Sequence, residues 1–283
     1  MIRRAEKEER TLLQELWTGQ EKEKKKEIAK LFTERRDEFS FVREEEGKIV
    51  SFLTVEKRVV MLRPYKVSAS FLYLPLQPDK ELCETALEIL SHQDLLSYMR
   101  TCEIPEGIAF EDLYARKDFS VRRGDLELRQ ERPYREELTP EEMLKEYIRY
   151  CGSFNGFIPR NRKDSEEILN SHPGKVLYVP YKAYALYEEE GEEVKIREIV
   201  YRDLDGLSFV LSELLKKYYL VRFTLSAGEH PERWLKGLQS ETVSPFRVRC
   251  NDPEMMSELL KRDVHDVKEA FAPLNVMMKE EFL

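Results

Sequence analysis

The chain has 283 residues, of which 41% are hydrophobic and 36% are charged, a composition that supports one large or two ordinary folded domains and excludes a disordered protein. Its formal net charge is -8, so the chain lacks the basic field that attracts nucleic acid. No apolar stretch reaches the ~18–20 residues of a membrane helix, and the charged start Met1–Glu9 does not resemble a secretory signal. We therefore expect a cytoplasmic protein that binds neither nucleic acid nor a membrane.

The cysteines and histidines do not suggest a metal centre. The four cysteines are widely separated, no pair forms a C-x-x-C motif, and no histidine lies near one at ligand spacing. They are Cys83, Cys102, Cys151 and Cys250. We expect small buried thiols and no bound metal.

The first segment predicts helices that give way to strands. Apolar residues at helical spacing predict the first helix: Leu12, Leu13, Leu16 and Trp17. A second amphipathic helix is expected around residues 28–32. From residue 39 the hydrophobic period changes to two, and turn residues at 45–48 and 63–65 divide the segment 39–76 into a three-strand antiparallel meander.

Asp79 stands at the N-cap position of the next predicted helix, whose apolar residues lie between 82 and 90. A strand is expected at 95–102, then a short helix at 109–117. A strand pair is expected at 119–128, with its turn at Gly124 and Asp125. This order of elements predicts a mixed sheet with helices on its faces.

The hydrophobic periodicity lapses around residues 129–133, which predicts a boundary between a domain at 1–131 and a second domain at 132–283. The second domain opens with a capping box, in which Thr139 is the N-cap, Pro140 the first helical residue and Glu142 the third.

The second half then repeats the order of the first half, without residue-level identity. A helix at 164–169 is followed by strands at 176–179, 183–187 and 194–201, a helix at 207–215, a strand at 220–225 and one more helix near 255–260. The expected fold class is α+β, with two tandem domains, each a mixed and largely antiparallel sheet flanked by helices.

Two stretches and this order of elements resemble the GNAT acyltransferases, specifically the Eis-like N-acetyltransferases. The stretches are Val42–Val55, with its Glu-Glu-Gly turn, and Leu113–Phe119, which is similar to the family's Tyr-x-x-x-Gly-Phe signature with Asp118 in place of the glycine. The resemblance implies tandem GNAT-like domains and acetyl-CoA as the acyl donor. It also implies a third domain whose terminal carboxylate acts as a base. Because little chain remains for such a domain, we do not assign that role to Leu283.

In GNAT proteins a glycine-rich loop after the fourth strand binds the acyl-CoA diphosphate at a helix N-terminus, and the strand edge pairs with the pantetheine arm. The resemblance places this cofactor edge at Leu74, Leu76 and Gln77, with Lys80 as a cation. The segment 73–82 contains no glycine, and Pro75 and Pro78 remove backbone donors. Its Asp79 and Glu81 add negative charge where the diphosphate would bind.

The same resemblance places Tyr114 at the tyrosine that protonates the departing CoA thiolate. A phenol suits this role because its reference pKa of ~10 keeps it protonated at neutral pH. The alternative is that Tyr114 anchors its segment against the sheet. For the base, Glu45, Glu103 and Glu106 are equal candidates.

Two functions therefore stay open. The first is an acyl-CoA-dependent N-acetyltransferase that acts on a primary amine of a small molecule or a protein by direct transfer. The second is a non-catalytic GNAT-derived protein that binds a ligand or a partner. The sequence does not indicate the oligomeric state.

Overall fold

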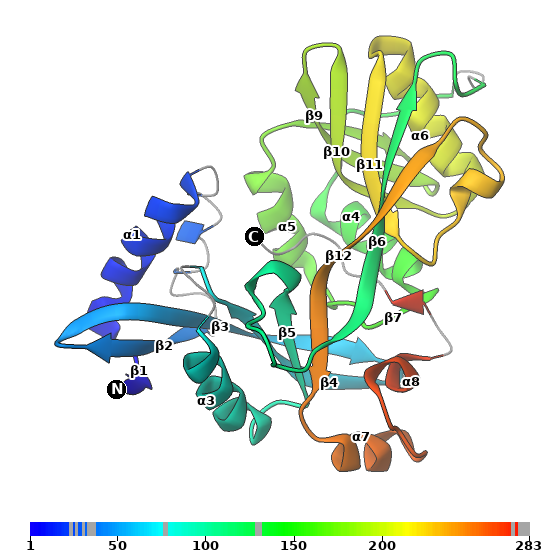
Figure 1. Ribbon diagram of the computed structural model, residues 1–283. Coiled ribbons are helices and arrows are strands. Elements are labelled where there is room, and N and C mark those ends of the chain that lie inside the picture. The colour runs from blue at the N-terminus through cyan, green and yellow to red at the C-terminus, as the bar shows by residue number, and fades with distance from the viewer. Residues whose placement is uncertain are drawn as a thin grey trace. The chain divides into compact units, whose positions relative to one another are not determined.

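The computed structural model describes residues 1–22, 25, 28–29, 32, 38–75, 79–127, 132–272 and 275–276 (Figure 1). The chain forms two compact units. Of the described residues, unit 1 contains 1–114 and 244–272, and unit 2 contains 115–243 and 275–276. The chain thus passes from unit 1 to unit 2 at residue 114, ahead of the expected boundary near 131. It returns to unit 1 at residue 243 and enters unit 2 again before residue 275.

The predicted first helix and meander are confirmed in unit 1. Helix α1 (Arg10–Gln20) precedes strands β2 (Glu38–Glu45), β3 (Lys48–Leu62) and β4 (Tyr65–Tyr73), which pair antiparallel in that order. The first hairpin turns at Glu46 and Gly47, which both have positive φ, as a two-residue turn that follows the strand twist requires. A short strand β1 (Ile2–Arg4) pairs with the outer edge of β2.

Helix α3 (Lys80–Ser91) connects β4 to the parallel strand β5 (Leu96–Arg100), as parallel pairing requires. Leu82, Ala86 and Leu90 on its apolar face are fully buried and pack in one cluster with sheet residues such as Leu53 and Met99. The predicted N-cap is confirmed, because the Asp79 carboxylate accepts a hydrogen bond from Leu82 N–H.

Later parts of the chain complete unit 1. Residues 246–250 of strand β12 (Gln239–Cys250), which the sequence did not predict, pair antiparallel with β5. The predicted helix near 255–260 is confirmed as α7 (Pro253–Leu260), and a short helix α8 (Val267–Phe271) follows.

The helix expected at 109–117 is wrong, because this segment belongs to strand β6 (Glu111–Arg122). One of its partners is β11 (Leu220–Ser226), which lies far away in sequence, so local periodicity could not identify the pairing. Within the described residues up to 127, the strand pair expected at 119–128 is also not formed: β6 ends at Arg122, and Gly124 lies in a turn that follows it.

Unit 2 follows the predicted order closely. Its helices are α4 (Pro140–Cys151), α5 (Arg162–Ser171) and α6 (Leu204–Lys217). Its other strands are β7 (Phe154–Asn155), β8 (Lys175–Val179), β9 (Ala183–Glu190) and β10 (Glu193–Tyr201), and β7 pairs with β13 (Asn275–Val276). The sheet order is β6-β11-β10-β9-β8. The predicted capping box of α4 is present, with Thr139 and Glu142 each bonded to the other's backbone N–H.

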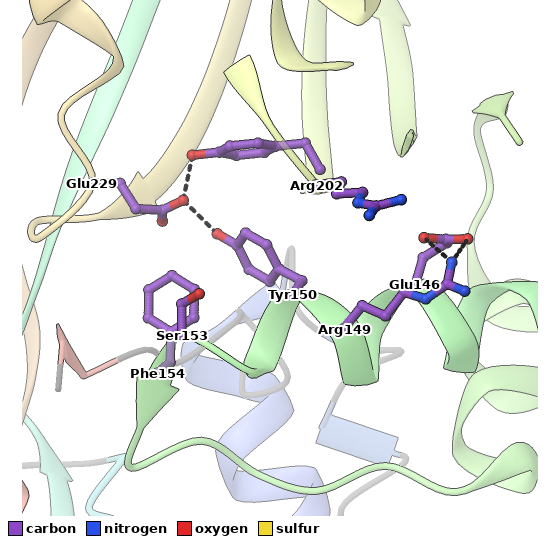
Figure 2. A pocket seen from close by; sticks show the side chains of 8 residues that line it. Glu146, Arg149, Tyr150, Ser153, Phe154, Arg202 and Glu229 are labelled. Atoms are coloured by element: carbon purple, nitrogen blue, oxygen red, sulfur yellow. Dashed lines mark hydrogen bonds and ion pairs between the residues drawn. The ribbon is translucent and has the colours of Figure 1, made fainter. Parts of the chain in front are cut away.

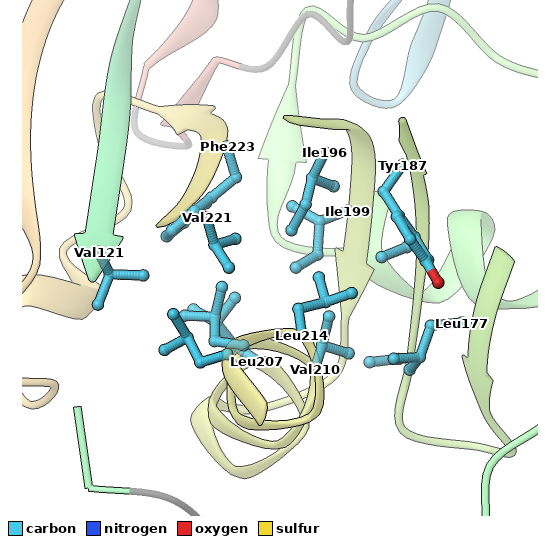
Figure 3. Close-up of a cluster of buried hydrophobic side chains, with 14 of the residues drawn as sticks. Val121, Leu177, Tyr187, Ile196, Ile199, Leu207, Val210, Leu214, Val221 and Phe223 are labelled. Atoms are coloured by element: carbon cyan, nitrogen blue, oxygen red, sulfur yellow. The ribbon is translucent and has the colours of Figure 1, made fainter. Parts of the chain in front are cut away.

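Helix α6 covers the sheet of unit 2 and joins the parallel strands β10 and β11. Figure 3 shows Leu207, Val210 and Leu214 of the helix facing Val221 and Ile199 of the sheet. The helix starts close to the sheet because Gly206 has no side chain: a Cβ there would lie 2.9 Å from a backbone carbonyl oxygen.

Candidate functional site

The carboxyl ends of β4 and β5 form the place in unit 1 where a parallel pair can bind a ligand. The two strands pair from Ala69 and Leu96 to Leu72 and Met99. Beyond this register, β4 continues to Tyr73 and the chain to Leu74, while β5 ends at Arg100. The backbone groups of Leu74 are therefore not part of the β4–β5 ladder.

A glutamate side chain occupies this strand end. Glu103 Oε2 accepts a hydrogen bond from Leu74 N–H at 2.8 Å, and Glu103 Oε1 lies 2.8 Å from Arg100 Nη1. Arg100 also pairs with Glu21 at 3.1 Å. Burial by itself lowers the pKa of Arg100, but Glu103 and Glu21 outweigh it and hold the pKa above its ordinary value. The amide at the predicted cofactor edge is thus bound by the chain's own carboxylate.

The N-terminus of α3 carries a second internal carboxylate. Asp79 is 7% exposed; its Oδ1 accepts from Leu82 N–H at 3.1 Å and its Oδ2 lies 2.7 Å from Arg43 Nε. The positive end of the helix dipole is therefore already neutralised at the position expected for a diphosphate. Lys80 is exposed and lies 3.8 Å from Glu84. The other predicted cofactor residues, Leu76 and Gln77, lie outside the described residues.

Tyr114 lies on strand β6 and not on the helix that the resemblance implied. Its side chain is buried, and its hydroxyl lies 2.9 Å from the hydroxyl of Tyr98. Its ring meets Phe271 edge to face at 6.2 Å. Burial, and then Tyr98, raise its pKa well above the ordinary value of a phenol. Its role as an acid remains a prediction.

The three candidate bases lie in different environments. Glu45 is 57% exposed and pairs with Arg43, and Glu106 is exposed. Of the three, only Glu103 lies at the strand ends, where its carboxylate is engaged by Leu74 and Arg100.

Unit 2 has the same parallel pair, but with a cavity at its carboxyl ends. Strands β10 and β11 pair only from Glu193 and Leu220 to Lys195 and Arg222, and β10 has an irregularity between Ile196 and Glu198 before it ends at Tyr201. A cavity of about 230 Å³ lies beyond these pairs (Figure 2). It is lined by Glu146, Arg149, Tyr150, Ser153, Phe154, Tyr201, Arg202 and Glu229.

Glu229 organises one side of this cavity. Its Oε1 accepts hydrogen bonds from the hydroxyls of Tyr150, at 2.7 Å, and Tyr201, and its Oε2 accepts from Ser226 N–H at 2.9 Å. Burial, and then the Glu229 charge, raise the pKa values of both tyrosines, so both phenols stay protonated and donate. The ring of Tyr150 also packs against Phe154 at 5.0 Å and Tyr201 at 5.5 Å.

The two arginines of the cavity differ in their partners. Arg149 Nη1 pairs with Glu146 at 3.1 Å, and Figure 2 shows this pair away from Glu229. Arg202 is exposed, and its guanidinium has no hydrogen-bond or ion-pair partner among the residues that the structure describes. Sequence reasoning missed this site because Tyr150 and Glu229 are 79 residues apart and Tyr150 fits the apolar side of a helix.

Helix α6 is capped as α3 is. Asp203 accepts from Gly206 N–H at 2.9 Å and pairs with Lys182 at 2.9 Å. In the described part of the chain, no group of three or more His, Cys, Asp or Glu side chains could hold a metal ion. Nor does any helix of that part have the length and apolar character needed to cross a membrane.

No protein-family model and no curated protein matches the sequence. Solved structures match the fold. A probable N-acyltransferase of unknown function from Enterococcus faecalis is 13% identical, with a TM-score of 0.73 over 88% of this chain and 72% of the other. A GCN5-related N-acetyltransferase from Anabaena variabilis is 10% identical, with a TM-score of 0.70 over 89% of this chain and 73% of the other. Eis1 from Mycobacterium abscessus is 11% identical, with a TM-score of 0.67 over 93% of this chain and 76% of the other.

This chain has an Eis-like GNAT fold. The fold class expected from the sequence is therefore confirmed, and the fold is similar to that of the GNAT structures named above. In this GNAT fold, unit 1 carries carboxylates at two of the positions assigned to acyl-CoA: Glu103 at the strand end and Asp79 at the helix N-terminus.

Proposed function

We propose that the protein is a non-catalytic GNAT-fold binding protein whose unit 1 does not use acyl-CoA. The hydrogen bond from Leu74 N–H to the buried Glu103 carboxylate carries this proposal. A pantetheine arm at this edge would have to displace Glu103 and leave Arg100 with one carboxylate fewer. A charge-assisted hydrogen bond contributes roughly 1.5–3 kcal/mol, so its loss weakens binding by ~10- to 100-fold. Asp79 adds repulsion toward a diphosphate.

The test is a thermal melt with acetyl-CoA. A ligand at ~100 times its dissociation constant adds ~2.7 kcal/mol to the folded state, which raises the melting temperature of a domain of this size by ~5–10 °C. We expect no shift up to millimolar acetyl-CoA. A reproducible increase in the melting temperature, seen with acetyl-CoA and also with desulfo-CoA, would contradict the proposal.

A second candidate is an acyl-CoA-dependent N-acetyltransferase that acts on a primary amine, with Tyr114 as the general acid. The fold shared with N-acetyltransferases favours it. If acetyl-CoA raises the melting temperature, a panel of small-molecule and peptide amines follows, with CoA release as the readout. Under this candidate, Tyr114→Phe lowers kcat by ~10²-fold or more while the acetyl-CoA dissociation constant stays the same.

A further inference from the structure

The cavity of unit 2 lies where an open parallel sheet binds ligands, beyond the carboxyl ends of two parallel strands that have stopped pairing. We propose that this cavity binds a small monocarboxylic acid with an aromatic or branched apolar body. The inference deepens the proposed binding role by naming a site and a ligand class. It rests on the proposed function in one respect: the molecule is bound in the cavity and undergoes no reaction there.

One positive charge in the cavity lining is available to a ligand. Glu146 and Arg149 neutralise each other at 3.1 Å. Glu229 accepts three hydrogen bonds from neutral donors, which hold its carboxylate at one side of the cavity. Arg202 is left as the cation without a partner in the described chain. A carboxylate fits the planar fork of a guanidinium in a bidentate manner.

The walls select the body of the ligand. Tyr150, Phe154 and Tyr201 line the cavity with ring surface, and the hydroxyls of both tyrosines are turned to Glu229. These rings favour an aromatic or branched aliphatic group. The hydrogen bonds to Glu229 also fix the two tyrosine side chains, so the wall is formed before a ligand enters.

A carboxylate at the N-terminus of α6, where a nucleotide diphosphate would be expected to bind, disfavours a larger anionic ligand. At the N-terminus of α6 the Asp203 carboxylate holds Gly206 N–H and pairs with Lys182. A diphosphate would meet this negative charge, and Gly206 N–H is already bonded to it. A volume of about 230 Å³ also suits a molecule far smaller than a coenzyme.

The experiment uses the full chain with ligand-observed NMR and calorimetry. The probes are a panel of aromatic and branched aliphatic monocarboxylates that includes phenylacetate and isovalerate, with phenethylamine and 2-phenylethanol as cationic and neutral counterparts. We expect saturable binding of carboxylates with one site per chain and at least ~10-fold weaker binding of the amine and the alcohol.

Arg202→Gln should weaken carboxylate binding by ~10- to 100-fold and leave the melting temperature of the unliganded protein unchanged. The matched control is Arg222→Gln, which removes an exposed arginine that pairs with Glu193 at the opposite end of the same strands. It should bind as the wild type does. Absence of binding across the panel at 10 mM, equal binding of the amine, or undiminished binding by Arg202→Gln would each overturn the inference. None of these outcomes depends on acetyl-CoA, so the melt described above tests the proposed function separately.

Discussion

Replacing Glu103 by alanine should destabilise the protein strongly although the residue lies in a single turn of 3₁₀ helix, Thr101–Glu103, and in no strand ladder. Glu103 is 7% exposed, accepts a hydrogen bond from Leu74 N–H and pairs with Arg100 Nη1. The variant leaves a buried amide without its acceptor, which costs roughly 1–3 kcal/mol. It also leaves Arg100 with Glu21 as its ion-pair partner among the residues that the structure describes. Removing one partner of a buried pair costs about 3–5 kcal/mol, and since the two effects overlap we expect a total loss of about 3–4 kcal/mol.

The assay is equilibrium unfolding in urea, followed by far-UV circular dichroism. For a protein of this size, a loss of this order lowers the melting temperature by ~6–16 °C. Glu103→Gln keeps an oxygen that can accept from Leu74 N–H and should lose only about 1–2 kcal/mol. Glu106→Ala, an exposed glutamate three residues later, is the matched control and should change stability by less than ~0.5 kcal/mol.

A double variant separates the ion pair from the amide contact. Arg100→Met in the Glu103→Ala background removes the cation that Glu103→Ala leaves with too little negative charge around it. The double variant should therefore lose at least ~1 kcal/mol less stability than the two single variants lose together. The reasoning is refuted if Glu103→Ala unfolds within 0.5 kcal/mol of the wild type, or if the two losses add without coupling.

Three further predictions concern local structure. Gly206→Ala should lower the free energy of unfolding by about 1–2 kcal/mol, because the new Cβ would lie 2.9 Å from a carbonyl oxygen. Gly19→Ala, with no atom within 4 Å of its Cβ, should raise it by about 0.5–1 kcal/mol in helix α1. Urea titrations compare the two variants, and equal effects would contradict the close approach at Gly206. Thr139→Ala should lose about 1 kcal/mol with its capping box, and amide exchange should rise first at the start of α4; unchanged exchange there would argue against the cap. The hydrogen bond from Arg3 lowers the pKa of Glu9 to about 2, so this carboxylate stabilises the folded state above its ordinary pKa and stops doing so as the pH falls toward 2. In Arg3→Gln, a carbon-detected NMR titration should find the Glu9 pKa near its ordinary value of 4.5, and stability should fall less between pH 5 and 2; a pKa that stays near 2 would exclude Arg3 as the cause.

The sequence predicted the elements whose determinants are local. The caps at Asp79 and Thr139 and the apolar stripe of α6 depend on residues three or four positions apart, and all three are confirmed. Strands β6 and β12 were missed or taken for a helix because their partners lie far away in the chain. A strand that is stabilised by distant partners need not show a strong period of its own.

The candidate site was less predictable than the fold for the same reason. The absence of glycine after β4 directed attention to the predicted cofactor edge, but the local sequence did not indicate that Glu103 binds there. Glu103 is 29 residues from Leu74, and nothing in the local sequence distinguishes it from Glu106. Likewise, the Glu229 hub brings together Tyr150 and Tyr201 from separate elements, so only the structure identifies it.

Each unit contains a strand, a helix and a parallel strand in that order, β4-α3-β5 in unit 1 and β10-α6-β11 in unit 2. A comparison of the two favours ligand binding in unit 2. Both helices begin with an aspartate that pairs with a cation, Arg43 at Asp79 and Lys182 at Asp203, so each helix N-terminus already holds a carboxylate of the chain. The strand ends differ. In unit 1 the Glu103 carboxylate accepts a hydrogen bond from Leu74 N–H, directly after β4, and so occupies the strand edge. In unit 2 two phenols and an amide hold Glu229 at one side, and a cavity with an unpartnered Arg202 among the described residues lies beside it. A cavity with charged and aromatic lining thus lies at the parallel strand ends of unit 2, whereas at the corresponding strand ends of unit 1 the Glu103 carboxylate binds the Leu74 amide.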